Sequence, residues 1–254
     1  MFNLSSIPVP DLTGKTVLVT GAGQGIGAQL VETLIKHGAI VFAGVYGVPV
    51  AQDQKRLAGA QVLDLDVRDA ANVHSTIRAI EDSAGGLDVL VNNAGIISQI
   101  GPVETLDSAS LSAAFEVNVT GLHRLTCAAL PLLKSSKGVV VNAGTGAATT
   151  PMQGWAAYCC SKAAAHMLTR MFDMELADTG IQHFFIGIPP TDTDMQAKIR
   201  ISGLNPVSQI PQSDLVKPEV TASVMAWLCS DAARAVDEVF LDVRDAFFTE
   251  MMAR

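Results

Sequence analysis

The chain has few charged residues, few aromatic residues and no excess of positive charge. Of its 254 residues, 17% are charged and 5% aromatic, whereas 49% are hydrophobic. Its 17 lysines and arginines are outnumbered by 25 aspartates and glutamates, so the net charge is −8. Nucleic-acid binding needs a basic surface that neutralises phosphates, and we therefore expect no nucleic-acid partner. The apolar content argues against a globally disordered chain.

Long apolar runs are also missing. The uncharged stretches 39–52 and 138–161 are interrupted by glycine, proline or polar residues, so neither resembles a membrane-spanning helix of ~20 apolar residues. The first twelve residues, MFNLSSIPVPDL, lack a basic region followed by an apolar stretch, which predicts no secretory signal. We expect no membrane partner and a cytoplasmic location.

The four cysteines show no CxxC spacing, and two of them, Cys159 and Cys160, are adjacent. Such spacing favours reduced thiols over a disulfide framework or a zinc site. Asp192 and Asp194 share one expected loop, where carboxylates more often cap a helix or face solvent than bind a divalent ion. We expect no metal site.

Short β-branched runs alternate along the chain with longer segments of helical apolar spacing. The expected strands are 16–20, 40–43, 62–65, 89–91, 138–142 and 183–188, with 239–243 as a candidate seventh. The expected helices are 26–37, 73–83, 111–133 and 157–179. Apolar strands joined through helices predict one doubly wound (Rossmann) α/β domain over 1–254, after an N-terminal arm at 1–12. Its parallel sheet would have about seven strands, with helices on both faces.

A glycine-rich turn, GAGQGIG at 21–27, joins the first expected strand to the first expected helix. Glycines let the backbone turn tightly and approach a pyrophosphate, and the helix N-terminus stabilises its negative charge. In this strand–turn–helix context the motif predicts a dinucleotide site. The expected contacts are Gly21, Gln24, Gly25, Ile26 and Gly27.

The end of the second expected strand bears on the choice of cofactor. The position that usually carries an acidic ribose ligand falls on Gly44-Val45-Tyr46, which offers neither a carboxylate nor an arginine. We expect NAD(P) as cofactor, with a slight lean to NADP and with Val45 beside the ribose. Asp66 and Val67 follow the third strand and are expected cofactor contacts, although Asp66 either faces the adenine or is a solvated carboxylate.

Tyr158 and Lys162 are four residues apart at the start of an expected helix, so their side chains share one face. A phenol has a reference pKa near ~10 and exchanges protons poorly at neutral pH unless a cation stabilises the phenolate. Lys162 supplies that charge. The pair predicts proton exchange with an alcohol or carbonyl oxygen while a nicotinamide exchanges a hydride.

Four motifs in this order resemble those of the short-chain dehydrogenase/reductase family, in its compact single-domain branch. They are the turn at 20–27, Asn-Asn-Ala-Gly at 92–95, Asn118, and Tyr158-xxx-Lys162. The resemblance runs from Thr16 to about Met195 and more weakly to Val243.

The resemblance implies a role for each matched residue. Asn118 supports a proton-relay water to Lys162, and Tyr158 is the acid/base. The family's catalytic serine, thirteen residues before the tyrosine, falls on Thr145, which keeps a hydroxyl group. The expected catalytic set is therefore Asn118, Thr145, Tyr158 and Lys162. Further expected cofactor contacts are Asn93, Ala94, Gly95, Thr191 and Thr193, together with Tyr158 and Lys162.

The chain also departs from the family pattern at two places. The family's Pro-Gly after the sixth strand aligns with Ile188-Pro189, although 193–195 fits the pattern that follows. By this alignment the Thr191 backbone and the Thr193 hydroxyl meet the nicotinamide carboxamide. Near the C-terminus the family's Asp-Gly-Gly is replaced by Asp-Val-Arg at 242–244.

These features predict an NAD(P)-dependent oxidoreductase that interconverts a secondary alcohol and a carbonyl compound, with Tyr158 as acid/base. The alternative is a catalytically silent nucleotide-binding regulator or scaffold on the same fold. The loop at about 188–215 resembles the family's substrate lid, and nearby apolar residues either line a substrate pocket or belong to the core or to subunit contacts. These residues are Met152, Trp155, Met195, Ile199 and Leu204. The resemblance also implies a homodimer or homotetramer built on the helices 111–133 and 157–179.

Overall fold

Seven parallel strands form a single sheet in a computed structural model that describes residues 3–47 and 57–253. The strand order is β3-β2-β1-β4-β5-β6-β7. The strands are β1 (Thr16–Thr20), β2 (Ile40–Val45), β3 (Gln61–Asp64), β4 (Val89–Asn92), β5 (Val139–Gly144), β6 (Gln182–Gly187) and β7 (Phe240–Asp242). The order reverses between β1 and β4, and ligands of doubly wound folds bind at the carboxyl ends of the strands at such a point. The expected fold class is confirmed.

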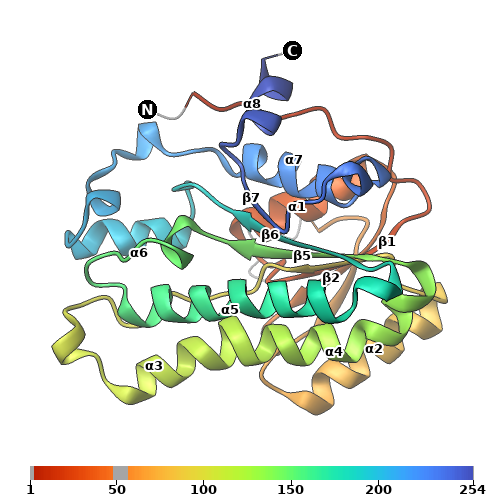
Figure 1. Cartoon of the computed structure of the whole chain (residues 1–254), viewed down its shortest axis with the longest axis horizontal. Coiled ribbons are helices and arrows are strands. Elements are labelled where there is room, and N and C mark those ends of the chain that lie inside the picture. The colour runs from red at the N-terminus through yellow and green to blue at the C-terminus, as the bar shows by residue number, and fades with distance from the viewer. Residues whose placement is uncertain (1–2, 48–56, 254) are drawn as a thin grey trace.

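Helices cover both faces of this sheet (Figure 1). One face carries α1 (Gly25–Lys36), α7 (Pro218–Leu228) and α8 (Ala246–Met252). The other carries α2 (Ala70–Ala84), α4 (Leu122–Ser136) and α5 (Ala156–Glu175), with α3 (Ser108–Phe115) leading into α4. The remaining helix, α6 (Asp194–Ser202), follows β6. None of the helices in the described ranges is long and apolar enough to cross a membrane.

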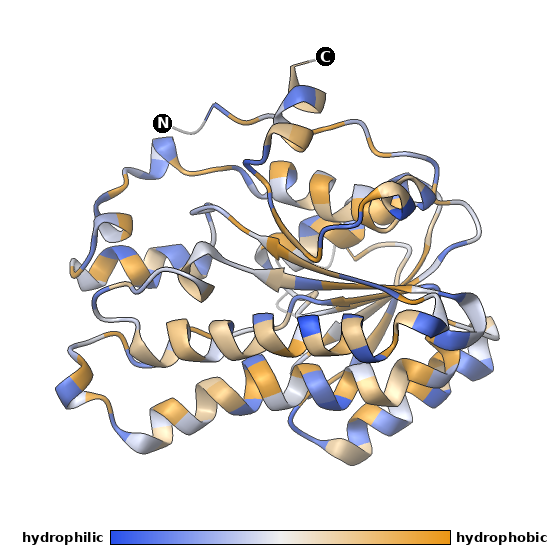
Figure 2. Ribbon diagram, in the orientation of Figure 1, coloured by the Kyte–Doolittle hydropathy of each residue, from blue (hydrophilic) through white to orange (hydrophobic). Residues whose placement is uncertain are grey.

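The central strands β1, β4 and β5 are mostly apolar and buried along their whole length because both faces of the sheet are covered there (Figure 2), whereas the edge strand β3 is mostly exposed. In β1, Val17 and Val19 belong to the core under α1 and α7, whereas Leu18 belongs to the core under α2 and α4. This alternation follows from the two-residue period of a strand. Complete burial of each such side chain stabilises the fold by about 1.5–3 kcal/mol.

A buried polar chain ties α5 to the centre of the sheet. The amide nitrogen of Asn92 donates to the amide oxygen of Asn142 at 2.8 Å, and Asn142 donates to the hydroxyl of Thr169 on α5 at 3.0 Å. Buried polar groups that satisfy one another fix one arrangement of the elements that carry them. The position of α5 against β5 is thereby set.

The expected helix at 111–133 is confirmed, because residues 108–136 are helical throughout, but it is not α-helical along its whole length. A π-helical turn, Glu116–Gly121, separates α3 from α4. Apolar spacing indicated the helix but not the π-helical turn within it. Such turns are frequent at functional sites, and this one contains Asn118.

Candidate active site

The glycine turn brings α1 close to the end of β1. Gly21 and Gly25 have φ of +61° and +55°, in the left-handed region that favours glycine. At Gly27 a Cβ atom would lie 2.2 Å from the Gly21 carbonyl oxygen. Only a glycine allows this approach, and it leaves the first amides of α1 at the carboxyl end of the sheet.

Asn93 holds this turn in place. Its side-chain nitrogen donates to the carbonyl oxygens of Thr20 at 3.0 Å and of Gly21 at 3.2 Å. In return, the Thr20 hydroxyl accepts from the backbone N–H groups of Asn93 and Ala94, at 3.0 and 2.9 Å. The predicted contact residues of β1 and β4 thus form one unit. Thr20 was not among the predicted site residues.

At the end of β2, Val45 is buried, and its Cγ1 lies 3.0 Å from the point that a Cβ of Gly23 would occupy. Asp66 was expected either to face the adenine or to be solvated, and neither expectation included an ion pair with Arg68. Arg68 binds both oxygens of Asp66, at 2.8 and 2.7 Å, which lowers the pKa of that carboxyl. The Arg68 guanidinium carbon also lies 4.8 Å from the ring centroid of Tyr46. A cation therefore stands beside the end of β2, and sequence reasoning missed it because Arg68 follows a different strand.

Tyr158 and Lys162 lie on the first turns of α5, and both are buried. The Lys162 ammonium donates to the Ala143 carbonyl oxygen at 2.8 Å and lies 5.9 Å from the centroid of the Tyr158 ring. Burial lowers the pKa of Lys162 to about 8 and raises that of Tyr158 to about 12. At neutral pH the phenol therefore keeps its proton, and the lysine is mostly charged.

Thr145 follows β5 directly and faces Tyr158. Its hydroxyl accepts from the Ala147 backbone N–H at 3.2 Å, which caps a short 3₁₀ turn, Gly146–Ala148. This hydroxyl also opposes the burial-driven rise in the pKa of Tyr158. Since a hydroxyl both donates and accepts, Thr145 can still donate to a substrate oxygen beside the phenol.

Asn118 is held on both sides of its amide. Its oxygen accepts from the Ile96 N–H at 2.9 Å, and its nitrogen donates to the Ile96 carbonyl and to the Ser161 hydroxyl, at 3.0 and 2.9 Å. The point that a Cβ of Gly95 would occupy lies 3.3 Å from the Asn118 oxygen and 3.5 Å from the Lys162 nitrogen. Asn118 and Lys162 thus flank Gly95. Sequence reasoning did not find Ser161.

The loop after β6 carries the two predicted threonines. The Thr191 hydroxyl donates to the Pro189 carbonyl oxygen at 2.8 Å, and the Val216 N–H donates to the Pro190 carbonyl oxygen at 3.0 Å. Thr193 caps α6. Pro189, which stands where the family pattern has glycine, lies in this loop, and residue 216 bonds the loop on both sides of Thr191 through Pro190 and Asp192.

A cavity of about 530 Å³ lies where these elements meet. The predicted residues that line it are Ile26, Asn93, Gly95, Thr145, Tyr158, Lys162, Thr191 and Thr193. Its apolar wall includes four of the five apolar candidates, Met152, Trp155, Met195 and Ile199. Leu204 instead packs beside Gly154. The lining also contains Gln196 and Arg244, which were not predicted as site residues. Only Arg244 had left a sequence signal, as a departure from the family's Asp-Gly-Gly.

The other predicted site residues lie outside the lining of this cavity. They are Gly21, Gln24, Gly25, Gly27, Val45, Asp66, Val67, Ala94 and Asn118. Gln24 precedes α1, and its side chain makes no capping hydrogen bond. Val67 is buried and packs against the π-helical turn at Gly121. Asn118 lies outside the lining and is bonded to Ile96 and Ser161. The roles assigned to these residues, and to the predicted residues that line the cavity, stay predictions.

Known proteins resemble the chain in sequence and in fold. The family described as short chain dehydrogenase matches residues 15–202. The 2,3-dihydro-2,3-dihydroxybenzoate dehydrogenase of Bacillus subtilis is 31% identical over 87% of this chain and 91% of its own length. The benzil reductase ((S)-benzoin forming) of Saccharomyces cerevisiae is 32% identical over 85% of this chain and 90% of its own. The crystal structure of gox2181 superposes with a TM-score of 0.81 at 25% identity, covering 94% of this chain and 97% of that one.

Proposed function

This chain belongs to the short chain dehydrogenase family of oxidoreductases, and we propose that it interconverts a secondary alcohol and a carbonyl compound with NAD(P) as cofactor. The observation that carries the proposal is the buried Tyr158–Lys162 pair, which shares one cavity with Thr145 and adjoins the glycine turn. A scaffold that only binds nucleotide has no evident use for a phenol beside a buried ammonium.

The glycine turn fits a dinucleotide cofactor, because Gly21, Gly25 and Gly27 leave a cradle that side chains would fill. The amides at the start of α1 would hold the pyrophosphate. The ends of β2 and β3 would hold the adenosine, and the loop with Thr191 and Thr193 the nicotinamide. When bound, the cofactor supplies the hydride acceptor or donor.

The residues of the chain supply the proton chemistry. In the reductive direction the Tyr158 phenol gives its proton to the carbonyl oxygen of the substrate, and in the oxidative direction the phenolate takes it from the alcohol. The Lys162 ammonium lowers the cost of the phenolate, since an opposite charge nearby favours the charged form. Thr145 orients the substrate oxygen, and Asn118 fixes the segment around Gly95 beside Lys162.

The names of two relatives support this reaction class. One is a dehydrogenase of a dihydroxy compound, and the other a reductase that forms (S)-benzoin from benzil. Both act on hydroxyl or keto groups of ring-bearing molecules, and the apolar wall of the cavity would contact such a ring.

NADP is the cofactor that we favour, by a small margin. No carboxylate at Val45 opposes a 2′-phosphate, and the Arg68 guanidinium stands beside Tyr46 at the end of β2. The pairing of Arg68 with Asp66 limits its free charge, so the discrimination between the two cofactors should be weak.

We propose in addition that copies of the chain associate through the α4–α5 face. Met167, Met171 and Met174 on α5 are 53%, 38% and 64% exposed, which is unusual for apolar side chains of one helix. Light scattering on the eluting peak of a sizing column tests this association.

The direct test of the function follows nicotinamide absorbance with NADH and NADPH across ketones, and with NAD and NADP across secondary alcohols. The proposal predicts turnover with at least one pair. If calorimetry shows bound cofactor but the whole panel gives no turnover, the silent-scaffold alternative replaces it.

A further inference from the structure

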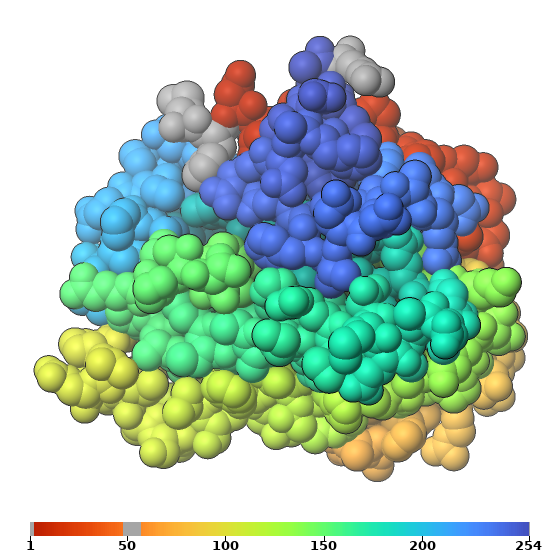
Figure 3. Space-filling view, viewed as in Figure 1, coloured from red at the N-terminus to blue at the C-terminus, as the bar shows by residue number. Residues whose placement is uncertain are grey.

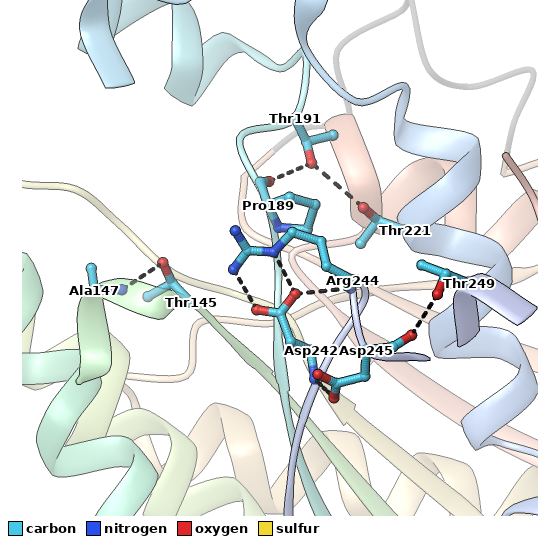
Figure 4. Close-up of polar contacts among 9 residues, drawn as sticks. All are labelled: Thr145, Ala147, Pro189, Thr191, Thr221, Asp242, Arg244, Asp245 and Thr249. Atoms are coloured by element: carbon cyan, nitrogen blue, oxygen red, sulfur yellow. Dashed lines mark hydrogen bonds and ion pairs between the residues drawn. The ribbon is translucent and has the colours of Figure 1, made fainter. Parts of the chain in front are cut away.

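The segment that follows the last strand, β7, places an arginine at the candidate active site. Arg244 follows β7 by two residues, and its Nε and Nη2 donate to the two carboxylate oxygens of Asp242, both at 2.7 Å. The point that a Cβ of Gly146 would occupy, one residue after Thr145, lies 3.8 Å from Nη2 of Arg244. In Figure 4 the guanidinium lies between Asp242 and Pro189, with its terminal nitrogens toward Thr145.

This contact joins two distant parts of the sequence. On the molecular surface the C-terminal segment, in dark blue, adjoins the green segment that follows β5 (Figure 3). Arg244 lines the same cavity as Thr145, Tyr158 and Lys162. The family's glycine at this place would leave the cavity wall without a side chain, so Arg244 adds a charged group that the common pattern lacks.

The charges around the cavity are one-sided. Among the described residues its lining contains Lys162 and Arg244 but no aspartate or glutamate, although acidic residues outnumber basic ones in the chain. Lys162 is engaged by the Ala143 carbonyl and by Tyr158. Nη1 of Arg244 has no hydrogen-bond partner in the described part of the chain, so it is the cationic donor open to a ligand.

The pairing with Asp242 holds the Arg244 side chain in one position and still leaves Nη1 able to donate to a ligand. Its side chain is 13% exposed, and both of its oxygens are occupied by Arg244. A two-point pair removes the freedom of a long side chain before a ligand arrives, which lowers the ordering cost of binding. Because Asp242 already balances one charge, a singly charged carboxylate suits the site better than a doubly charged phosphate.

We propose that Arg244 binds the carboxylate of the substrate, so that the substrate is an oxo acid or the corresponding hydroxy acid. The inference rests on the proposed oxidoreductase function. The reacting carbon lies at Thr145 and Tyr158, a few bonds from the carboxylate, because Gly146 is the neighbour of both Thr145 and Arg244. The rest of the substrate contacts the apolar wall formed by Met152, Trp155 and Met195 among others.

The test compares 2-oxo-4-phenylbutanoate and 4-oxo-4-phenylbutanoate with their methyl esters, which differ from the acids only in charge and a methyl group. The parent should show the higher kcat/KM for at least one acid. Arg244→Met should lower the acid-to-ester ratio of kcat/KM by about 10- to 100-fold, because hydrogen bonds to charged groups contribute about 1.5–3 kcal/mol. Arg244→Lys keeps the positive charge but not the planar two-point geometry of the guanidinium, so its acid-to-ester ratio should stay above that of Arg244→Met.

The control is Arg234→Met, since Arg234 is exposed, donates to the carbonyls of Gly180 and Lys137 and is not among the residues that line the cavity. It should leave the ratio as in the parent. The inference is overturned if the parent prefers the ester in both pairs, or if Arg244→Met does not change the acid-to-ester ratio of kcat/KM. Either result leaves the oxidoreductase proposal standing.

A binding experiment separates the two proposals. Calorimetry on the parent with bound reduced cofactor should show 2-hydroxy-4-phenylbutanoate binding more tightly than its methyl ester, and this needs neither turnover nor a variant that folds. If the acid binds more tightly than the ester but no substrate undergoes hydride transfer, the proposed reaction is wrong and the carboxylate site stands. Equal binding of acid and ester, with turnover of neutral ketones, would remove the carboxylate site alone.

Discussion

The ammonium nitrogen of Lys162 lies 5.9 Å from the ring centroid of Tyr158, one helical turn earlier on α5, and both side chains are buried. Each shifts toward its uncharged form by desolvation, with the pKa of Lys162 lowered to about 8 and that of Tyr158 raised to about 12. Ionisation of the phenol places a negative charge beside the ammonium, so each charge then offsets the burial cost of the other.

The lowered pKa of Lys162 predicts a pH-dependent stability. Between about pH 8 and 10.5 the unfolded lysine holds a proton that the folded one has released, so the free energy of unfolding rises with pH. Over pH 8 to 10 this gain is about 2–3 kcal/mol. The raised pKa of Tyr158 acts in the opposite sense only above about pH 10.

Urea unfolding of cofactor-free parent and Lys162→Met at pH 8 and pH 10 measures this effect. The difference in unfolding free energy between the two proteins should change by the stated amount. Identical pH slopes would mean that Lys162 titrates near its ordinary value.

Gly27→Ala should weaken both the fold and cofactor binding. The added methyl would lie 2.2 Å from the Gly21 carbonyl oxygen and 2.6 Å from the side-chain nitrogen of Asn93, so the turn must shift. Overpacking of this kind costs about 1–3 kcal/mol. Gly86→Ala is the matched control, because a Cβ there meets nothing within 4 Å. Calorimetry on the two variants measures the cofactor Kd. Equal Kd values would show that the glycine turn does not hold the pyrophosphate.

Val45→Asp should shift the cofactor preference toward NAD. The new carboxylate accepts from both ribose hydroxyls and repels a 2′-phosphate, whereas Val45→Asn has the same shape without the charge. We expect the NAD-to-NADP ratio of kcat/KM to rise about tenfold or more for aspartate and to change little for asparagine. If both substitutions give the parent's ratio, Val45 does not border the ribose.

Thr145 should be replaceable by serine but not by valine. Thr145→Ser keeps the hydroxyl, while Thr145→Val keeps the shape and deletes the hydrogen bond to the substrate oxygen. We expect kcat to fall about 10- to 100-fold for valine and to stay within a few-fold of the parent for serine. A valine variant as active as the serine variant would show that another group orients the substrate.

The sequence predicted those features of the fold and site that depend on neighbours in the chain. The glycine turn after β1 is one continuous segment, and Tyr158 and Lys162 share a helix face by spacing alone. The central strands were recognisable because burial on both faces makes them mostly apolar. Family resemblance then supplied roles for Asn118 and Thr145.

The features that were missed depend on contacts between distant segments. Arg68 binds Asp66 and at the same time reaches Tyr46, and no local pattern announces this. Ser161 holds Asn118 across 43 residues. Arg244 was visible as an unusual residue after β7, but only the packing of the C-terminal segment beside Gly146 places it at the cavity.

Tyr158→Phe gives the sharpest test of the proposed proton transfer, because it deletes the proton donor and keeps the ring. The measurement is the single-turnover rate of hydride transfer with a competent substrate and saturating cofactor, for the parent and the variant. General acid–base catalysis contributes about 10²–10⁴-fold, so the rate should fall by at least about 100-fold while the cofactor Kd stays within a few-fold of the parent. Equal single-turnover rates for the two proteins would contradict the account, since the proton would then come from another group.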